Sequence, residues 1–209
     1  MDNGILAQIL RNPELCSMGH GQDADTGNLG MGWLYYALAR VYRPDHVVCI
    51  GSWRGFVPLM FAQGMHDNGR GRVTFIDPGM VDDHWHDPGA VQAWFGGYGT
   101  TNIDHYCMTT QEFVDTEAYA GIQSVDILFI DGMHTCEQAR IDHRSFAPLM
   151  SANSIALFHD SVSNGQSRIY GEPYAYTVYQ YIDQLRQDPD LQILDLPFEN
   201  GLTMVRRIG

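Results

Sequence analysis

The sequence predicts an α/β domain built on a mostly parallel β-sheet with helices on both of its faces. Short apolar runs alternate with helical stretches from about residue 46 onward, which is the pattern of successive β-α-β units. The last two apolar runs flank Asn200-Gly201, a pair that favours a tight antiparallel hairpin. A length of 209 residues with 44% hydrophobic residues suits one domain with a sizeable core.

Five strands and a closing hairpin are expected, which together give a doubly wound, seven-stranded sheet. The strand candidates are His46–Ile50, Arg72–Ile76, Ile103–Cys107, Val125–Ile130 and Ser154–His159. The hairpin would join residues 191–196 (LQILDL) to residues 202–207 (LTMVRR).

Helices are expected between these strands and before the hairpin. The candidates are Val57–Met65, Val91–Phe95, Gln111–Ala118, Cys136–Phe146 and Tyr174–Leu185. Before the first strand, Met31–Val41 is the one helix candidate, and residues 1–44 are expected to form a helical cap segment over one edge of the site. Because no repeat or low-complexity linker is present, residues 1–209 are predicted to form a single domain.

Charge and composition narrow the range of partners. A formal net charge of −13 disfavours nucleic acid, because phosphate binding needs clustered Lys and Arg. There is no apolar run of membrane-spanning length and no secretory leader, so a membrane partner is not expected and a cytoplasmic location with reduced cysteines is. The expected partner is a small molecule, and a homo-oligomer is an open alternative.

A glycine turn follows the first strand. Gly51 and Gly55 bracket Ser52, Trp53 and Arg54 and lead into a helix, where backbone N–H groups face a ligand. The dinucleotide fingerprint needs a glycine two residues after the first, but Trp53 stands there. This indole argues against NAD or FAD and for an adenosyl ligand without phosphates. A turn that binds nothing is the alternative.

Two further strand ends offer polar groups to such a ligand. Asp77 ends the second strand, and its carboxylate can accept hydrogen bonds from both ribose hydroxyls, although a loop-capping role is the alternative. After the third strand, Thr110 and Gln111 can bond the adenine ring nitrogens. Thr110 is equally suited to cap the helix that would start at Gln111.

An Asp/His constellation follows the fourth and fifth strands. Asp131 and His134 follow one strand, and His159 and Asp160 end the other. If these strands are neighbours, the four groups converge at the carboxyl edge of the sheet. Asp131, His159 and Asp160 are candidate ligands for Mg²⁺ or Mn²⁺, with His134 left as a general base. The alternative is that both aspartates bond loops without a metal.

Two aromatic regions are candidates for binding roles. Residues 82–87 (DDHWHD) have the density of a metal site but precede Pro-Gly, so a loop over the cofactor is preferred, with Trp85 against adenine. Near Arg168, a set of tyrosines suits an acceptor pocket, although the helical spacing of its later members favours ordinary packing. The set comprises Tyr170, Tyr174, Tyr176, Tyr179 and Tyr181.

From Trp33 onward, the sequence resembles a group of class I methyltransferases that includes macrolide-sugar O-methyltransferases and cephalosporin hydroxylase-like proteins. The resemblance rests on the segments VVCIGSWRGFVPLMFA, VTFIDP, VDILFIDGMH and ALFHDS, and on the terminal hairpin. It implies a Rossmann-like fold, S-adenosylmethionine bound by Gly51, Gly55 and Asp77, metal ligands at Asp131 and Asp160, and a general base at His134.

Two positions depart from the group's pattern. Cys49 stands where the group usually has Glu, and His159 stands where metal-dependent members often have Glu. The resemblance implies methyl transfer to oxygen on a small hydroxylated acceptor, such as a sugar or a natural-product intermediate. A catalytically inactive S-adenosylmethionine-binding protein and a nicotinamide oxidoreductase are the alternatives.

Overall fold

A computed structural model describes residues 1–16, 18, 20–162, 164–169 and 172–208. Its main sheet has seven strands in the order β10-β11-β7-β6-β3-β4-β5. Neighbouring strands from β7 to β5 pair in parallel, and β11 runs antiparallel to both β7 and β10. The strands are β3 (His46–Ile50), β4 (Arg72–Ile76), β5 (Ile103–Tyr106), β6 (Val125–Ile130), β7 (Met150–His159), β10 (Leu191–Leu196) and β11 (Leu202–Arg207).

This order confirms the predicted fold class, including the closing hairpin of β10 and β11. The chain passes from β3 outward to β4 and β5, and then crosses back to β6 on the other side of β3. Such a reversal of strand order opens a crevice at the carboxyl ends of the two central strands. The topology therefore places any ligand site beside the tips of β3 and β6.

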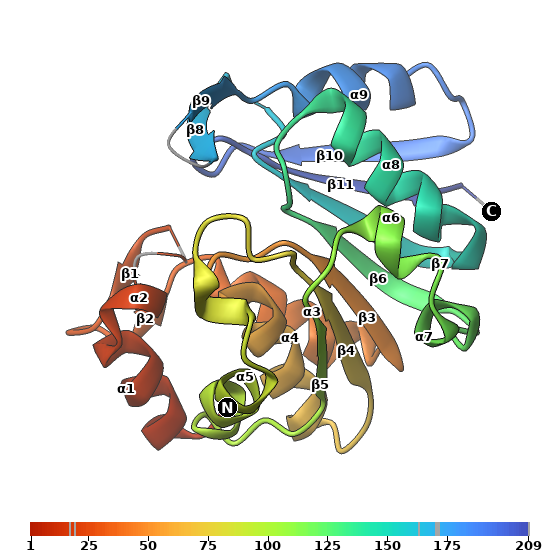
Figure 1. Ribbon diagram of the computed structural model, residues 1–209. Coiled ribbons are helices and arrows are strands. Elements are labelled where there is room, and N and C mark those ends of the chain that lie inside the picture. Colours follow the sequence, from red (N-terminus) through yellow and green to blue (C-terminus); the bar gives the residue numbers. More distant parts are fainter. Residues whose placement is uncertain (17, 19, 163, 170–171, 209) are drawn as a thin grey trace.

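Helices cover both faces of the sheet (Figure 1). One face carries α3 (Gly32–Tyr42), α4 (Phe56–Asp67) and α5 (Pro88–Gly96). The other carries α6 (Thr110–Phe113), α7 (Glu117–Ala120), α8 (Cys136–Phe146) and α9 (Val178–Leu185). The central strands are apolar almost throughout because both of their faces are buried.

Alternation along β3 shows how one strand serves two cores. Val47 and Cys49 pack into the cluster on the α3–α5 face, whereas Val48 and Ile50 pack into the cluster on the α6–α9 face. Successive side chains point to opposite faces of a sheet, so this one strand contributes to both hydrophobic cores. This holds the β3 tip, and the turn that follows it, in a fixed place.

The N-terminal segment contains more helices and strands than the single helix that was expected. It contains α1 (Asn3–Arg11), α2 (Pro13–Cys16) and a short hairpin of β1 (Gln22–Asp23) and β2 (Asn28–Leu29) before α3. Buried side chains of α1, α2 and β2 join the core cluster of α4 and α5. Two 3₁₀ turns, η1 (Asp83–Trp85) and η2 (Ala147–Leu149), and a hairpin of β8 (Gln166–Ile169) and β9 (Glu172–Ala175) complete the elements of the described residues.

Two helix predictions were wrong in extent. The helix expected over residues 111–118 is divided into α6 and α7, because the Thr116 side chain accepts from the Tyr119 amide and caps a second helix. The helix expected from Tyr174 begins only at Val178, because residues 172–175 pair with β8 and the Thr177 amide donates to the carbonyl of His134. In the described ranges, every helix is too short or too polar to cross a lipid bilayer.

Candidate active site

A cavity of about 460 Å³ lies at the carboxyl edge of the sheet. Its walls come from the segments after β3, β4, β5, β6 and β7, together with Met18 and His20 from the N-terminal segment and Tyr174 and Tyr176 beyond β7. The five strand ends predicted to carry the site therefore meet in one cavity, and its volume is typical of small-molecule sites.

The glycine turn after β3 is fixed by two close approaches. Gly51 and Gly55 both have φ of 71°, in the left-handed region that favours glycine. A side-chain carbon at Gly51 would lie 2.3 Å from the carbonyl oxygen of Asp131, and one at Gly55 would lie 2.6 Å from the Phe95 ring. Both positions therefore exclude side chains, which brings the turn against the β6 tip and against α5.

Trp53 lies at the cavity wall with 41% of its surface exposed, and the Arg54 guanidinium sits 4.3 Å from the centre of its ring. Arg54 is buried and forms ion pairs with Glu14 at 3.0 Å and Asp82 at 2.7 Å. These contacts join the turn to α2 and to the loop after β4. A cation–π contact orients the indole beside the ligand space.

In the loop formed by residues 82–87, Trp85 packs into the core while most of the other side chains are exposed. Trp85 is 3% exposed, stacks on Phe95 with ring centres 5.8 Å apart, and still contributes to the cavity lining. The Asp82 carboxylate accepts hydrogen bonds from the Arg54 guanidinium and the His84 amide. His86 Nδ1 lies 3.1 Å from Asp83 Oδ1. In the described part of the chain this loop contributes no member to a group of metal-ligand atoms.

Asp77 is held by two backbone amides. Its Oδ2 accepts from the Ser52 amide at 3.2 Å, and its Oδ1 accepts from the Gly79 amide at 2.9 Å. Burial raises the pKa of Asp77 although both amide bonds oppose that shift. The carboxylate is thus positioned at the edge of the cavity, with acceptor capacity left for a ligand.

After β5, the helix cap and the cavity-lining residues differ from those expected. Thr109 caps α6 in a capping box with Glu112, so the cap is not Thr110. The Thr110 hydroxyl donates to Asp142 Oδ1 at 2.6 Å. Gln111 is exposed, bonds Gln138, and does not line the cavity, whereas Thr110 does.

Asp142 and Gln138 of α8 line the cavity, and both were missed in the sequence. Ala139, Asp142 and Phe146 are the buried residues of this helix, and their spacing places them on one helical face. An aspartate on the apolar stripe of an amphipathic helix is the signal that identifies such a residue. Burial raises the pKa of Asp142 to about 6.

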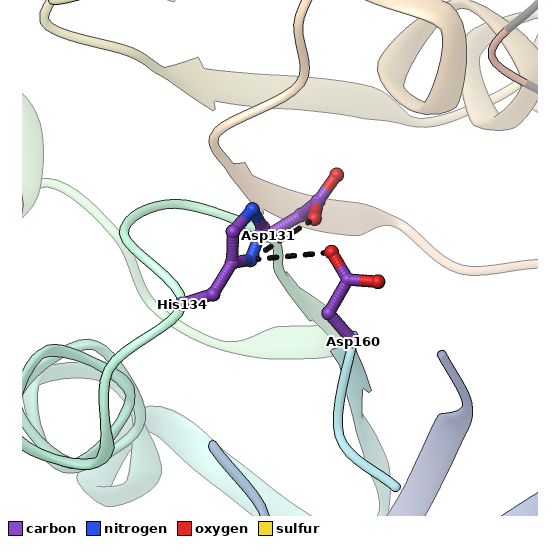
Figure 2. Close-up of side chains that lie close together, drawn as sticks. All are labelled: Asp131, His134 and Asp160. Atoms are coloured by element: carbon purple, nitrogen blue, oxygen red, sulfur yellow. Dashed lines mark ion pairs between the residues drawn. The ribbon is translucent and has the colours of Figure 1, made fainter. Parts of the chain in front are cut away.

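The tips of β6 and β7 bring Asp131, His134 and Asp160 together (Figure 2). His134 Nδ1 lies 3.8 Å from Asp131 Oδ1 and 3.5 Å from Asp160 Oδ2. One ligand atom from each of the three residues lies within 4.8 Å of the others. Asp160 has a φ of 50°, a left-handed conformation that Asp tolerates better than most residues and that turns the chain directly after β7.

His159 approaches the same two carboxylates from β7. Its Nδ1 lies 3.1 Å from Asp131 Oδ1 and 3.4 Å from Asp160 Oδ2, although neither contact has the geometry of a hydrogen bond. Burial lowers the pKa of His159, but the charges of Asp131 and Asp160 outweigh it and raise this pKa to about 10. A proton on His159 would offset the negative charge of the half-buried Asp131 and the buried Asp160, and a cation bound to the same carboxylates would take the place of that proton.

Two carboxylate oxygens and an imidazole nitrogen suit a divalent cation of intermediate hardness. The expected ligand set was Asp131, His159 and Asp160, whereas the compact group contains His134 in place of His159. The buried Nδ1 of His159 faces the same carboxylates without a hydrogen bond. These donors fit a metal ion.

Aromatic rings border the Asp/His cluster. His20 stacks on His159 with ring centres 5.3 Å apart, and the ring centres of Tyr176 and His134 are 4.4 Å apart. Tyr174 also lines the cavity. Of the other tyrosines considered, Tyr181 and Tyr179 both belong to α9, where Tyr181 is buried in the core and Tyr179 is half-buried. Tyr170 and the Arg168 side chain lie outside the described residues.

Comparison with known proteins identifies the family. The family model described as "Methyltransferase domain" matches residues 48–161, which is more than half of the chain and includes the strands that carry the site. The chain belongs to this methyltransferase family. The resemblance that the sequence motifs indicated is thereby confirmed.

Solved structures share the fold of this methyltransferase. The chain is similar to the SAH-bound methyltransferase PaMTH1 of Podospora anserina (TM-score 0.68, 16% identity, 100% of this chain and 89% of that one). It is also similar to the O-methyltransferase TomG of Streptomyces achromogenes, in complex with SAM and involved in tomaymycin synthesis (TM-score 0.65, 14% identity, 100% of this chain and 91% of that one). A third similar structure is an O-methyltransferase of Bacillus cereus in complex with SAH (TM-score 0.68, 12% identity, 100% of this chain and 92% of that one).

A curated relative is larger. The methyltransferase is 29% identical over 192 residues to the uncharacterized protein y4gI of Sinorhizobium fredii, a match that covers 86% of this chain and 18% of the relative. The chain therefore spans less than a fifth of the length of that relative.

Proposed function

We propose that this methyltransferase transfers the methyl group of S-adenosylmethionine to a hydroxyl oxygen of a small hydroxylated acceptor, such as a sugar or a natural-product intermediate. One observation carries the proposal: a single cavity contains both the glycine turn with Asp77 and the cluster of Asp131, His134 and Asp160. The proposed nucleoside site and the proposed proton-accepting site would therefore be adjacent.

The cofactor would lie along the turn after β3. Gly51, Ser52, Trp53 and Gly55 offer a backbone surface without phosphate-binding side chains, and Asp77 would accept from the ribose hydroxyls. Thr110 remains a proposed contact for adenine, whereas Gln111 lies outside the cavity lining and bonds Gln138 instead. Asp131 would face the methionine part. The relatives bound to SAM or SAH support this cofactor.

The reaction requires a hydroxyl to lose its proton as its oxygen attacks the methyl carbon. The new C–O bond forms while the bond from the methyl carbon to the sulfonium sulfur breaks, which leaves S-adenosylhomocysteine. His134 would accept the hydroxyl proton on its imidazole, and Asp131 and Asp160 would stabilise the resulting imidazolium. The aromatic rings of Tyr174 and Tyr176 would help to exclude water.

Asp131, His159 and Asp160 would hold Mg²⁺ or Mn²⁺ in this proposal. A bound cation lowers the pKa of a coordinated hydroxyl and orients it. His134 would then be free for proton transfer. We further propose a cytoplasmic location, where free cysteines such as the buried Cys49 stay reduced.

Calorimetric titration with S-adenosylhomocysteine and with NAD tests the cofactor. We expect binding of S-adenosylhomocysteine and not of NAD, and tight binding of NAD alone would contradict the proposal. Turnover is then measured with methyl-labelled S-adenosylmethionine across a panel of diols, phenols and sugars. Cofactor binding without transfer to any of them would favour an inactive binding protein.

A further inference from the structure

Asp142 has one carboxylate oxygen with a full set of partners and one with none. Oδ1 accepts from the Thr110 hydroxyl at 2.6 Å and from Gln138 Nε2 at 2.8 Å. Oδ2 is buried and has no hydrogen-bond partner, although the side chain borders the cavity. Asp142 is 1% exposed. A buried, unpaired carboxylate oxygen is costly, so a donor from outside the chain is expected to satisfy it.

The neighbouring side chains cannot supply this donor. The hydroxyl of Thr110 already donates to Oδ1, and the amide nitrogen of Gln138 is shared between Asp142 Oδ1 and Gln111 Oε1. Gly132, which borders the same space, carries no side chain, and a carbon placed on it would lie 3.6 Å from Oδ2. A carbon there would be in ordinary contact with Oδ2, so the lack of a side chain at Gly132 leaves a small space beside the unpaired oxygen.

The walls around this point suit a flat heterocycle. Met108 and Met133 line the cavity together with Gly132, Thr110 and Asp142. Thioether side chains adapt to ring faces and make favourable contacts with them. A carboxylate only accepts hydrogen bonds, so the matching group on the ring must be an N–H donor.

We propose that Asp142 Oδ2 accepts a hydrogen bond from the exocyclic 6-amino group of the cofactor's adenine and so selects a 6-amino purine over a 6-oxo purine. This inference rests on the proposed function. A 6-oxo purine presents an acceptor at the same position, which would face the carboxylate oxygen and leave both without a donor. A site built to receive a hydrogen bond rejects an analogue that lacks the donor far more strongly than an apolar pocket does.

Calorimetry at pH 7.5 compares S-adenosylhomocysteine with S-inosylhomocysteine, its 6-oxo counterpart. The wild-type protein is expected to bind the adenosyl compound about ten- to a hundredfold more tightly, as for a lost hydrogen bond to a charged group. In Asp142→Asn the amide oxygen can still accept from Thr110 and Gln138, while the amide N–H₂ takes the place of Oδ2. We expect this variant to lose at least tenfold in affinity for the adenosyl compound and to narrow or reverse the preference.

Asp183→Asn is the matched control, because it removes one carboxylate from an exposed position on α9 whose ion-pair partner is Arg186. It should bind both compounds as the wild type does. Equal wild-type affinity for the two compounds would overturn the inference even if Asp142→Asn failed to fold. A folded Asp142→Asn that keeps the full preference would also overturn it and assign Oδ2 to a water molecule. Failure of the wild type to bind S-adenosylhomocysteine would instead overturn the proposed function, and the inference with it.

Discussion

A side-chain carbon on Gly51 would lie 2.3 Å from the carbonyl oxygen of Asp131, so the turn after β3 meets the tip of β6 backbone to backbone. The Asp131 amide also donates to the Ile50 carbonyl at 2.8 Å. The proposed cofactor turn and the proposed chemical cluster are therefore fixed relative to each other by main-chain contacts. Neither can shift without the other.

Substitution of Gly51 by alanine tests this contact. Gly69 has nearly the same φ, 70° against 71°, but a side-chain carbon placed on it would have no other atom within 4 Å. Gly69→Ala should lower the free energy of unfolding by only about 1–2 kcal/mol, the cost of a side chain in the left-handed conformation. Gly51→Ala should lower the free energy of unfolding clearly more, as measured by urea unfolding. It should also bind S-adenosylhomocysteine poorly, as measured by calorimetry. Equal losses in the two variants would show that the turn can move away from β6.

Removal of the proposed catalytic groups should abolish transfer without unfolding the protein. Asp131→Ala and His134→Ala are each expected to lower kcat by about 100-fold or more, the range for loss of a general base. His66→Ala, at an exposed position on α4, is the control and should leave kcat unchanged. Circular dichroism checks the fold, and full activity in both site variants would refute this assignment of the chemistry.

Loss of one carboxylate should weaken metal binding. Asp160→Asn removes a charge while keeping a residue that tolerates the left-handed conformation at this position. We expect Mn²⁺ affinity, followed by electron paramagnetic resonance of the free ion, to fall about tenfold or more relative to the wild type, since charged oxygens dominate binding of hard cations. Unchanged Mn²⁺ affinity, with Asp183→Asn as the reference, would exclude Asp160 as a ligand.

The stability of the ligand-free protein should depend on pH through Asp142. Burial raises the pKa of this carboxyl from 3.8 to about 6, and a pKa difference of that size corresponds to about 3 kcal/mol. Because the folded state holds the proton more tightly than the unfolded state, stability is lost as the pH rises from below 3.8 through 6. Asp142→Asn has no carboxyl group to titrate at this position. Its free energy of unfolding relative to that of the wild type should therefore rise by about 2 kcal/mol from about pH 4 to about pH 7.5.

Urea unfolding of both proteins at the two pH values measures this difference. Asp183→Asn provides the baseline, because Asp183 is largely exposed. A stability difference between Asp142→Asn and wild type that is the same at both pH values would show that Asp142 does not titrate abnormally in the folded protein.

Local pattern was sufficient for most of the sheet. The predicted strands over residues 46–50, 72–76 and 125–130 coincide with β3, β4 and β6, because each is an apolar run between turn-forming residues and is too short for a buried helix. The helix over residues 111–118 was misjudged because the caps at Thr109 and Thr116 compete for the same short segment. The β8–β9 hairpin was missed because its pairing is not marked by an apolar run.

The sequence by itself determined the strand-and-helix order, the glycine turn after β3 and the acids at the strand tips, since each depends on neighbours along the chain. Only the tertiary structure decided that His134 lies between Asp131 and Asp160 and that Asp142 borders the cavity with one unpaired oxygen. These relations depend on distances between segments far apart in the chain, and hydrophobic periodicity carries no information about such distances.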